Sequence, residues 1–225
     1  MLAPISDTGR FFRPARALRE FWDPTFRPSD AGLESWTISD GNNVKLWDPF
    51  HPMIPALKRV IDTTWPGTKL AVNEYSSGSG GKYHGGLLRA ALLGIFMQED
   101  LYMAEVWGQP GKGSFTFYAH KLYGNYDGKG GRVRGSFVPT KSSNGDLLSY
   151  AARDGGRTYV VLVNKNQKHA MSATIKLLAG AKTSQSFVIA QSLGPRVYAD
   201  APQPVSGTES TVRIPAFAAE LVVLE

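Results

Sequence analysis

The sequence predicts an α/β region followed by an all-β region. Up to about residue 126, segments with helical spacing of apolar residues alternate with short apolar strands, which is typical of a parallel sheet wrapped by helices. Beyond residue 131 only strand-like segments occur, several of them separated by glycine-containing turns, which favours an antiparallel β-sandwich. The stretch NYDGKGG at residues 125–131 separates the two patterns. We therefore expect domains at residues 1–130 and 131–225.

The α/β region contains three expected helices and two expected strands. Residues 1–50 are irregular and rich in proline, aspartate and aromatic residues, and order improves after Pro52, which suits a helix start. Apolar residues at helical spacing mark the helices, and short apolar runs mark the strands. In chain order we expect a helix around Ile54–Ile61, a strand at Leu70–Tyr75, a helix around Leu87–Phe96, a strand at Leu101–Trp107 and a helix around Phe115–Tyr126.

The all-β region contains five expected strands. Each is an apolar run bounded by polar or turn-forming residues, as in a sandwich. The expected strands are Leu147–Ala152, Thr158–Asn164, Ser172–Leu178, Ser186–Gln191 and Val212–Leu224.

Composition excludes several classes of function. The chain has 225 residues, 42% of them hydrophobic, so a packed core is expected. The net charge is +6, but the 25 basic residues never form a run of four, so we expect no nucleic-acid partner. No stretch approaches 18 apolar residues, so we expect no membrane span, and the compartment stays unknown from the chain itself.

No cofactor or metal is predicted either. The chain has no cysteine, which excludes disulfides and zinc thiolate sites, and its four histidines never lie three to five residues apart. The glycine-rich stretch around residues 76–86 fails as a phosphate-binding loop, because Ser76 and Tyr83 stand where that motif needs glycine and serine or threonine.

Two side chains at strand ends suggest a carbohydrate site. Glu74 closes the strand at 70–75, and Trp107 closes the strand at 101–107. In a parallel βα array, functional residues gather at the carboxyl ends of the strands. A carboxylate beside an aromatic ring suits glycoside chemistry, in which the carboxylate attacks a sugar carbon and the ring stacks on a sugar face. The alternative is that Glu74 is an exposed charge at a strand end.

Several stretches resemble glycoside hydrolase family 44, chiefly PGTKLAVNEY, LLRAALLGIFMQEDLYMAEVW and NYDGKGG, with the resemblance running from about Arg16 to Lys165. That family consists of retaining endo-β-1,4-glucanases and xyloglucanases with a (β/α)8 barrel and a β-sandwich. The resemblance implies that Glu74 is the nucleophile at the end of the seventh barrel strand. Tyr75 also matches the family's Thr-Glu-Tyr-Asn motif, whereas Asn73 and Ser76 depart from it.

The family's acid/base glutamate lies in an Asn-Glu-Pro segment, and this chain has no such segment, because its one Asn-Glu pair is followed by Tyr75. The resemblance therefore implies a partial (β/α)8 barrel (its last strands and helices) and most of a sandwich, from a truncated reading frame or a fragment. We expect such a chain to be inactive alone and to self-associate. We expect a β-glucan such as cellulose or xyloglucan as partner, and an extracellular location for the parent enzyme.

Further residues are implied as substrate contacts. Trp22 and Trp36 match tryptophans of the family's loop after the sixth strand, where they line the cleft or pack, and Tyr75 and Trp107 are expected to contact substrate. Glu105 shares a face with Trp107 and is expected to tune Glu74 or to face another charge. Two rival interpretations stay open: a non-catalytic glucan-binding or structural remnant, and another barrel glycosidase such as a xylanase or mannanase.

Overall fold

The computed structural model describes residues 18–26, 52–76 and 81–225. The chain separates into two compact units, residues 1–79 with 99–109, and residues 80–98 with 110–225. The expected domain boundary near residue 130 remains a prediction. By contacts, the helices between residues 80 and 130 belong to the same unit as the strands that follow them.

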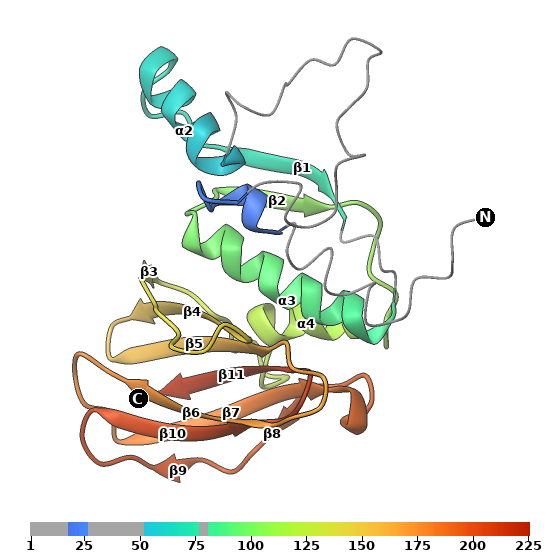
Figure 1. The fold of residues 1–225 in the computed structure, drawn as a ribbon, viewed down its shortest axis with the longest axis vertical. Helices are drawn as coiled ribbons and strands as arrows, with labels where there is room; N and C mark the ends of the chain where they lie inside the picture. The colour runs from blue at the N-terminus through green and yellow to red at the C-terminus, as the bar shows by residue number, and fades with distance from the viewer. Residues whose placement is uncertain (1–17, 27–51, 77–80) are drawn as a thin grey trace. The chain divides into compact units, whose positions relative to one another are not determined.

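The first unit contains a parallel pair of strands. Its elements are the 3-10 helix η1 (Leu18–Phe21), the helix α2 (Met53–Thr64) and the strands β1 (Ala71–Tyr75) and β2 (Met103–Val106). The strands β1 and β2 lie side by side and run in the same direction (Figure 1). The helix and both strands were predicted, and all three predictions are confirmed.

The second unit begins with two packed helices, α3 (Tyr83–Gln98) and α4 (Phe115–Gly124). Ser114 caps α4, since its Oγ accepts a hydrogen bond from the amide of Phe117 at 3.2 Å. The two helices approach closely at Gly86, where an added Cβ would lie 2.7 Å from the Cβ of Phe115. Most of α3 is apolar and buried, which fits a helix enclosed by other elements.

The remainder of this unit is antiparallel. One seven-stranded sheet has the order β3-β4-β5-β11-β7-β8, with β9 also pairing with β7, and a separate two-stranded sheet pairs β10 with β6. The strands are β3 (Ser136–Val138), β4 (Leu147–Asp154), β5 (Arg157–Asn164), β6 (Met171–Lys176), β7 (Thr183–Ala190), β8 (Tyr198–Ala199), β9 (Gln203–Pro204), β10 (Glu209–Ile214) and β11 (Ala218–Leu224); a short 3-10 helix, η5 (Gln191–Leu193), follows β7.

Both faces of the large sheet are covered, so this unit has three layers (Figure 1). On one face the ring of Tyr150 lies against Gly94 of α3, and Tyr126 packs on Tyr159 and Phe187. The opposite face forms an apolar core with β6 and β10. The buried members of this core are Ala151, Val160, Leu162, Val188, Ala190, Ile214, Ala218, Val222 and Leu224. Double coverage explains why β5 and β11 read as continuous apolar runs instead of alternating ones.

The predicted single strand at Val212–Leu224 is wrong, because it consists of two strands in different sheets. β10 ends at Ile214 and β11 begins at Ala218. Between them, Pro215 lacks the amide hydrogen that a ladder needs, and Phe217 has a φ of 49°. The chain therefore turns from the small sheet into the large one. The short strands β3, β8 and β9 were not predicted.

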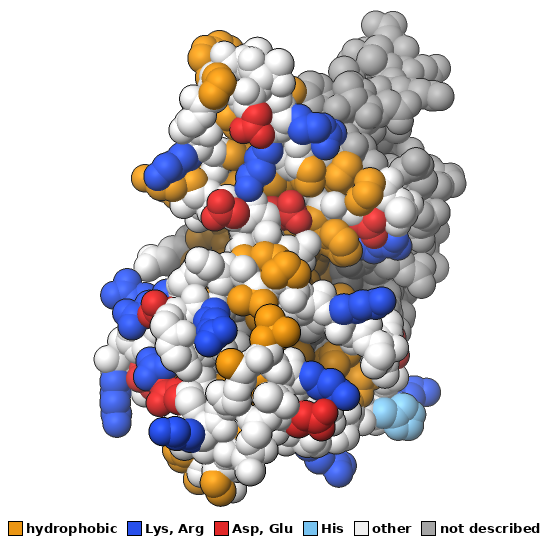
Figure 2. Space-filling view, turned by 90° about the vertical axis from the view of Figure 1, so that its left-hand side faces the viewer, with side chains coloured by type: hydrophobic (Ala, Val, Ile, Leu, Met, Phe, Trp, Pro, Cys, Tyr) orange, Lys and Arg blue, Asp and Glu red, His pale blue; other side chains and the backbone are white. Residues whose placement is uncertain are grey.

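Charged groups of both signs are interspersed on the face drawn in Figure 2. None of the helices in the described part of the chain combines the length and the hydropathy that a membrane span requires.

Candidate active site at the end of β1

The strand β1 is irregular where it carries Glu74. Val72 pairs with Ala104 and Tyr75 pairs with Val106, so Asn73 and Glu74 together oppose a single residue of β2. This is a β-bulge, a feature that re-aims side chains and is common beside active sites. The residue opposite the bulge is Glu105, so the alignment brings the two glutamates to neighbouring strand positions.

The backbone at Glu74 is also unusual. Glu74 has a φ of 62°, and Asp100 and Phe217 are the other two non-glycine residues with positive φ in the described part of the chain. A residue with a Cβ in this region is strained by roughly 1–2 kcal/mol, and such strain clusters at functional sites. The conformation turns Glu74 out of the regular alternation of the strand, and its side chain is exposed.

The neighbouring residues supply an aromatic surface. The amide of Trp107 donates a hydrogen bond to the carbonyl of Tyr75 at 2.8 Å, which fixes the start of the loop after β2. Trp107 is 63% exposed, whereas Tyr75 is only 9% exposed. Glu105 is exposed. The more exposed ring at this end of the strands is therefore Trp107.

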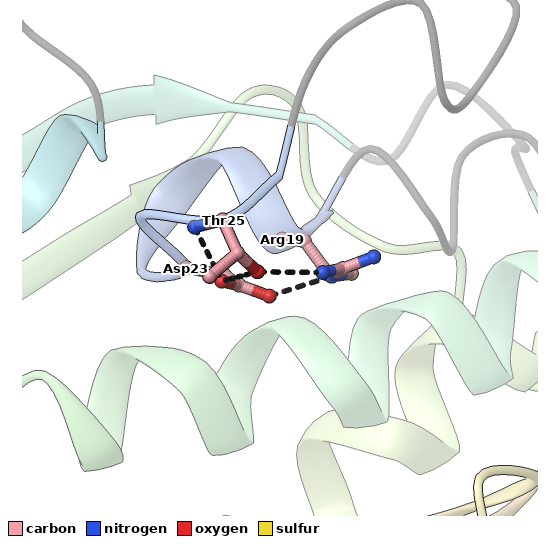
Figure 3. A network of polar contacts seen from close by, with 3 residues as sticks. All are labelled: Arg19, Asp23 and Thr25. Atoms are coloured by element: carbon pink, nitrogen blue, oxygen red, sulfur yellow. Dashed lines mark hydrogen bonds and ion pairs between the residues drawn. The ribbon is translucent and has the colours of Figure 1, made fainter.

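A polar network holds the turn after η1 (Figure 3). Arg19 Nε donates to Asp23 Oδ2 at 2.7 Å, and both the amide and the hydroxyl of Thr25 donate to Asp23 Oδ1, at 2.8 and 2.7 Å. Burial alone would raise the pKa of Asp23, but the hydrogen bonds from Thr25 and Arg19 outweigh burial and lower this pKa. The network fixes the turn that includes half-buried Trp22. Trp36 lies outside the described residues.

Sequence reasoning missed one perturbed carboxyl in this unit. Burial raises the pKa of Glu20, in η1, to about 7. A carboxyl with such a pKa can donate a proton near neutral pH. Nothing in the residue pattern around Glu20 signals this property, because it depends on tertiary burial. The network around Asp23 did have a signal, the Arg-x-x-x-Asp-x-Thr spacing at residues 19–25.

The part of the chain that the structure describes contains no group of three or more histidine, cysteine, aspartate or glutamate side chains arranged for a metal ion.

No protein-family profile matches the chain. Two curated proteins are similar to it: a β-mannanase/endoglucanase A of Caldicellulosiruptor saccharolyticus, 30% identical over 178 residues, and an endoglucanase A of Paenibacillus lautus, 31% identical over 175 residues. These alignments cover 77% and 76% of the chain but only 13% and 23% of the two relatives.

Solved structures give a match over more of the chain. A Paenibacillus polymyxa xyloglucanase from glycoside hydrolase family 44 matches with a TM-score of 0.78 and 29% identity, covering 95% of this chain and 41% of the xyloglucanase. A family 44 endoglucanase of Clostridium thermocellum matches with a TM-score of 0.79 and 30% identity, again over 95% of this chain and 41% of the neighbour.

Proposed function

We propose that this chain, a relative of the glycoside hydrolase family 44 enzymes, carries the nucleophile of a retaining endo-β-1,4-glucanase or xyloglucanase site. The observation that carries this proposal is the bulged, left-handed backbone at Glu74, at the carboxyl end of a parallel strand. In the proposal, β1 and β2 are consecutive strands of a partial (β/α)8 barrel. The names of the relatives, two endoglucanases and a xyloglucanase, support a β-glucan substrate.

The proposed reaction assigns a role to each group. The ionised Glu74 carboxylate attacks the anomeric carbon and forms a glycosyl ester, while the glycosidic C–O bond breaks and a second carboxylic acid protonates the leaving oxygen. Water then hydrolyses the ester. Trp107 stacks on a sugar ring, and Trp22, Trp36 and Tyr75 complete the contacts with substrate. Glu105 orients or tunes Glu74 from the adjacent strand.

The chain by itself lacks the segment that would supply the second carboxylic acid. No Asn-Glu-Pro segment occurs in the 225 residues. General acid–base assistance contributes about 10²–10⁴-fold to the rate. We therefore propose that the 225-residue chain alone has no measurable glucanase activity.

Release of reducing sugar from carboxymethylcellulose and xyloglucan by the purified chain tests this proposal. A family 44 enzyme under the same conditions is the positive control. Turnover at ordinary enzyme rates would show that the chain contains its own acid.

The role of Glu74 is tested in a longer protein that joins this chain to a barrel segment containing the Asn-Glu-Pro motif. Glu74→Gln keeps the shape of the side chain and removes its charge, so binding should persist while turnover collapses. Glu105→Gln is the matched control and should cost less. With Glu74→Ala, added azide should restore cleavage of an activated aryl glycoside and give the α-glycosyl azide. Near-parental turnover by Glu74→Gln would make Glu74 only a charge at a strand end.

A second function, glucan binding without catalysis, is favoured by the exposure of aromatic rings in the first unit. Trp65, Tyr102 and Trp107 are 69%, 63% and 63% exposed. Retardation of the chain in native gels containing xyloglucan would detect binding, and Trp107→Ala should weaken it. Leu178→Ala, at a 97% exposed position in the second unit, is the control. The same exposed apolar surface supports self-association of the chain.

A further inference from the structure

The core of the sandwich contains a carboxyl group that is not fully paired. Glu220 lies in the middle of β11 and is 2% exposed. The Ser186 hydroxyl donates a hydrogen bond to its Oε1 at 2.6 Å. Its Oε2 is buried and has no hydrogen-bond partner within the described residues. An unsatisfied buried carboxylate oxygen is costly, so it points to a ligand or a proton.

The strand register gathers further oxygen-bearing side chains on the same face. Ser186 pairs with Val222 and Val188 pairs with Glu220, so Ser186 and Glu220 are diagonal neighbours on the face that is turned toward β6 and β10. The amide of Asp200 donates to the carbonyl of Ser186 at 2.9 Å, which places Asp200 opposite Ser186. Ser184 pairs with Gln203 one step further along. Side chains two residues apart on a strand point to the same face.

These side chains border a cavity of about 360 Å³ at the β7–β8–β9 edge of the large sheet. Its opposite wall is β10, where Ser210 is buried and faces inward. Elsewhere this face of the sheet is apolar core. The sheet therefore changes from a hydrophobic to an oxygen-lined surface at one edge. Because one water occupies roughly 30 Å³ of liquid, the cavity has room for an ion with several waters.

The charge in this cavity is negative. Burial raises the pKa of Glu220 to about 7; the Ser186 hydrogen bond partly offsets this rise, and the negative charge of Asp200 adds to it. Glu209 and Arg213 also line the cavity from β10. They alternate with the inward-facing Ser210 and are exposed, and Glu209 is paired with Lys176 at 3.2 Å. The charged group that acts most directly on Glu220 is thus another carboxylate.

We propose that this cavity binds a calcium ion, with the Glu220 and Asp200 carboxylates as its anionic ligands and with Ser186, Gln203 and water completing an oxygen shell. Calcium takes six to eight oxygen ligands and tolerates irregular geometry, whereas zinc prefers nitrogen and sulfur. The described residues that line the cavity include no histidine or cysteine, and their third carboxylate, Glu209, is paired with Lys176. The two carboxylates balance the charge of one divalent cation. This site is independent of the proposed glucanase function.

Thermal unfolding of the EDTA-treated 225-residue chain, with and without 5 mM CaCl₂, tests the proposal. For a site with a Kd of about 10⁻⁴–10⁻³ M, typical of extracellular calcium modules, the Tm should rise by about 2–9 °C. MgCl₂ at the same concentration should give a smaller rise, and NaCl at matched ionic strength should give none. Equilibrium dialysis with ⁴⁵Ca should show one ion per chain.

Matched variants distinguish calcium binding in this cavity from a general effect of charge on the Tm. Glu220→Gln keeps the volume and removes the buried charge, so it should abolish the calcium-dependent rise in Tm. Asp200→Asn, at an exposed position, should weaken calcium binding by about tenfold or more and provides the test if Glu220→Gln does not fold. Glu209→Gln is the control: Glu209 also lines the cavity, but its exposed carboxylate is paired with Lys176, so this variant should keep the parental response.

Two results would overturn the proposal. One is a parental chain whose Tm and ⁴⁵Ca content do not respond to calcium up to 10 mM. The other is a calcium response that survives in both Glu220→Gln and Asp200→Asn, which would place any bound ion elsewhere.

Discussion

The strands β1 and β11 are the two extremes of this chain. In β11 every residue is buried, and the strand pairs with β5 and β7 in an unbroken register over seven residues. In β1 only Tyr75 is buried, and the register with β2 is broken at Asn73 and Glu74. A strand that is paired on both sides and covered on both faces cannot accommodate a strained backbone. A strand with an exposed, irregular end can hold a carboxylate away from the sheet.

The largest effect on stability should come from removing side-chain volume from β11, the strand that is covered on both faces. Leu221 is fully buried, and Leu221→Ala should destabilise the second unit by about 2–5 kcal/mol. The corresponding fall in Tm is roughly 5–15 °C for a chain of this size. Val72→Ala in β1 is the comparison, since Val72 is only partly buried, and it should lower the Tm much less. Equal losses from the two variants would contradict the contrast between the strands.

The next effect concerns the contact between α3 and the large sheet. An added Cβ at Gly94 would lie 2.3 Å from the ring of Tyr150. Gly94→Ala should therefore cost about 1–3 kcal/mol through overpacking, despite the better helix propensity of alanine. Gly124→Ala is the control in α4, because no atom lies within 4 Å of its added Cβ. Calorimetry should show a lowered Tm for Gly94→Ala alone.

A pH dependence should follow from the packing of α3 on α4. Arg89 Nη1 lies 2.9 Å from His120 Nε2, and because arginine can only donate, this histidine nitrogen must be unprotonated. Burial, followed by the charge of Arg89, lowers the pKa of His120 from its usual 6.5 to about 4. Unfolding then takes up a proton below pH 6.5, so the stabilisation is present above that pH and is lost as pH falls toward 4.

The expected loss over this interval is about 1–2 kcal/mol, reduced from the full shift because His120 is partly exposed to solvent. In His120→Gln, unfolding between pH 6.5 and 4 should take up about one proton fewer than in the parent. The free energy of unfolding should therefore fall less steeply as the pH is lowered. His169→Gln, which changes an exposed histidine, should keep the parental slope. Urea unfolding at a series of pH values measures both; parallel curves for parent and His120→Gln would contradict the assignment.

The smallest effect concerns Glu74 itself. Glycine adopts positive φ without strain, so Glu74→Gly should leave the free energy of unfolding within about 0.5 kcal/mol of the parent or raise it. Glu105→Gly, at a position of β2 without positive φ, should lose about 0.5–1 kcal/mol. If both substitutions destabilise equally, the left-handed conformation at Glu74 carries no strain.

Much of the fold could be predicted from the sequence because its signals are local. The helices around Ile54–Ile61, Leu87–Phe96 and Phe115–Tyr126 follow from apolar spacing and are confirmed, as is the parallel strand pair. The resemblance to family 44 is confirmed by the similar sequences and structures. The break at Pro215 was missed because an apolar run on both sides of it hid a change of sheet.

The candidate site was less accessible to sequence reasoning. The position of Glu74 at a strand end could be predicted, but the bulge depends on the register with β2, which no local pattern encodes. Glu220 had a signal, a carboxylate inside the apolar run AAELVVL, but its importance depends on residues brought to it from β7 and β8. The roles assigned to Glu74, Glu105, Trp22, Trp36, Tyr75 and Trp107 stay predictions.

The central place of β11 also determines the order in which the sandwich can be completed during synthesis. β11 is the last strand along the described chain, yet it lies between β5 and β7. Until the ribosome has released it, β5 and β7 each present an open, apolar edge, and such edges promote aggregation. The sheet therefore closes in a late step made of contacts distant in sequence, and slow folding is expected for such a topology. Expression at low temperature or with a chaperone that shields nascent edges should favour soluble chain.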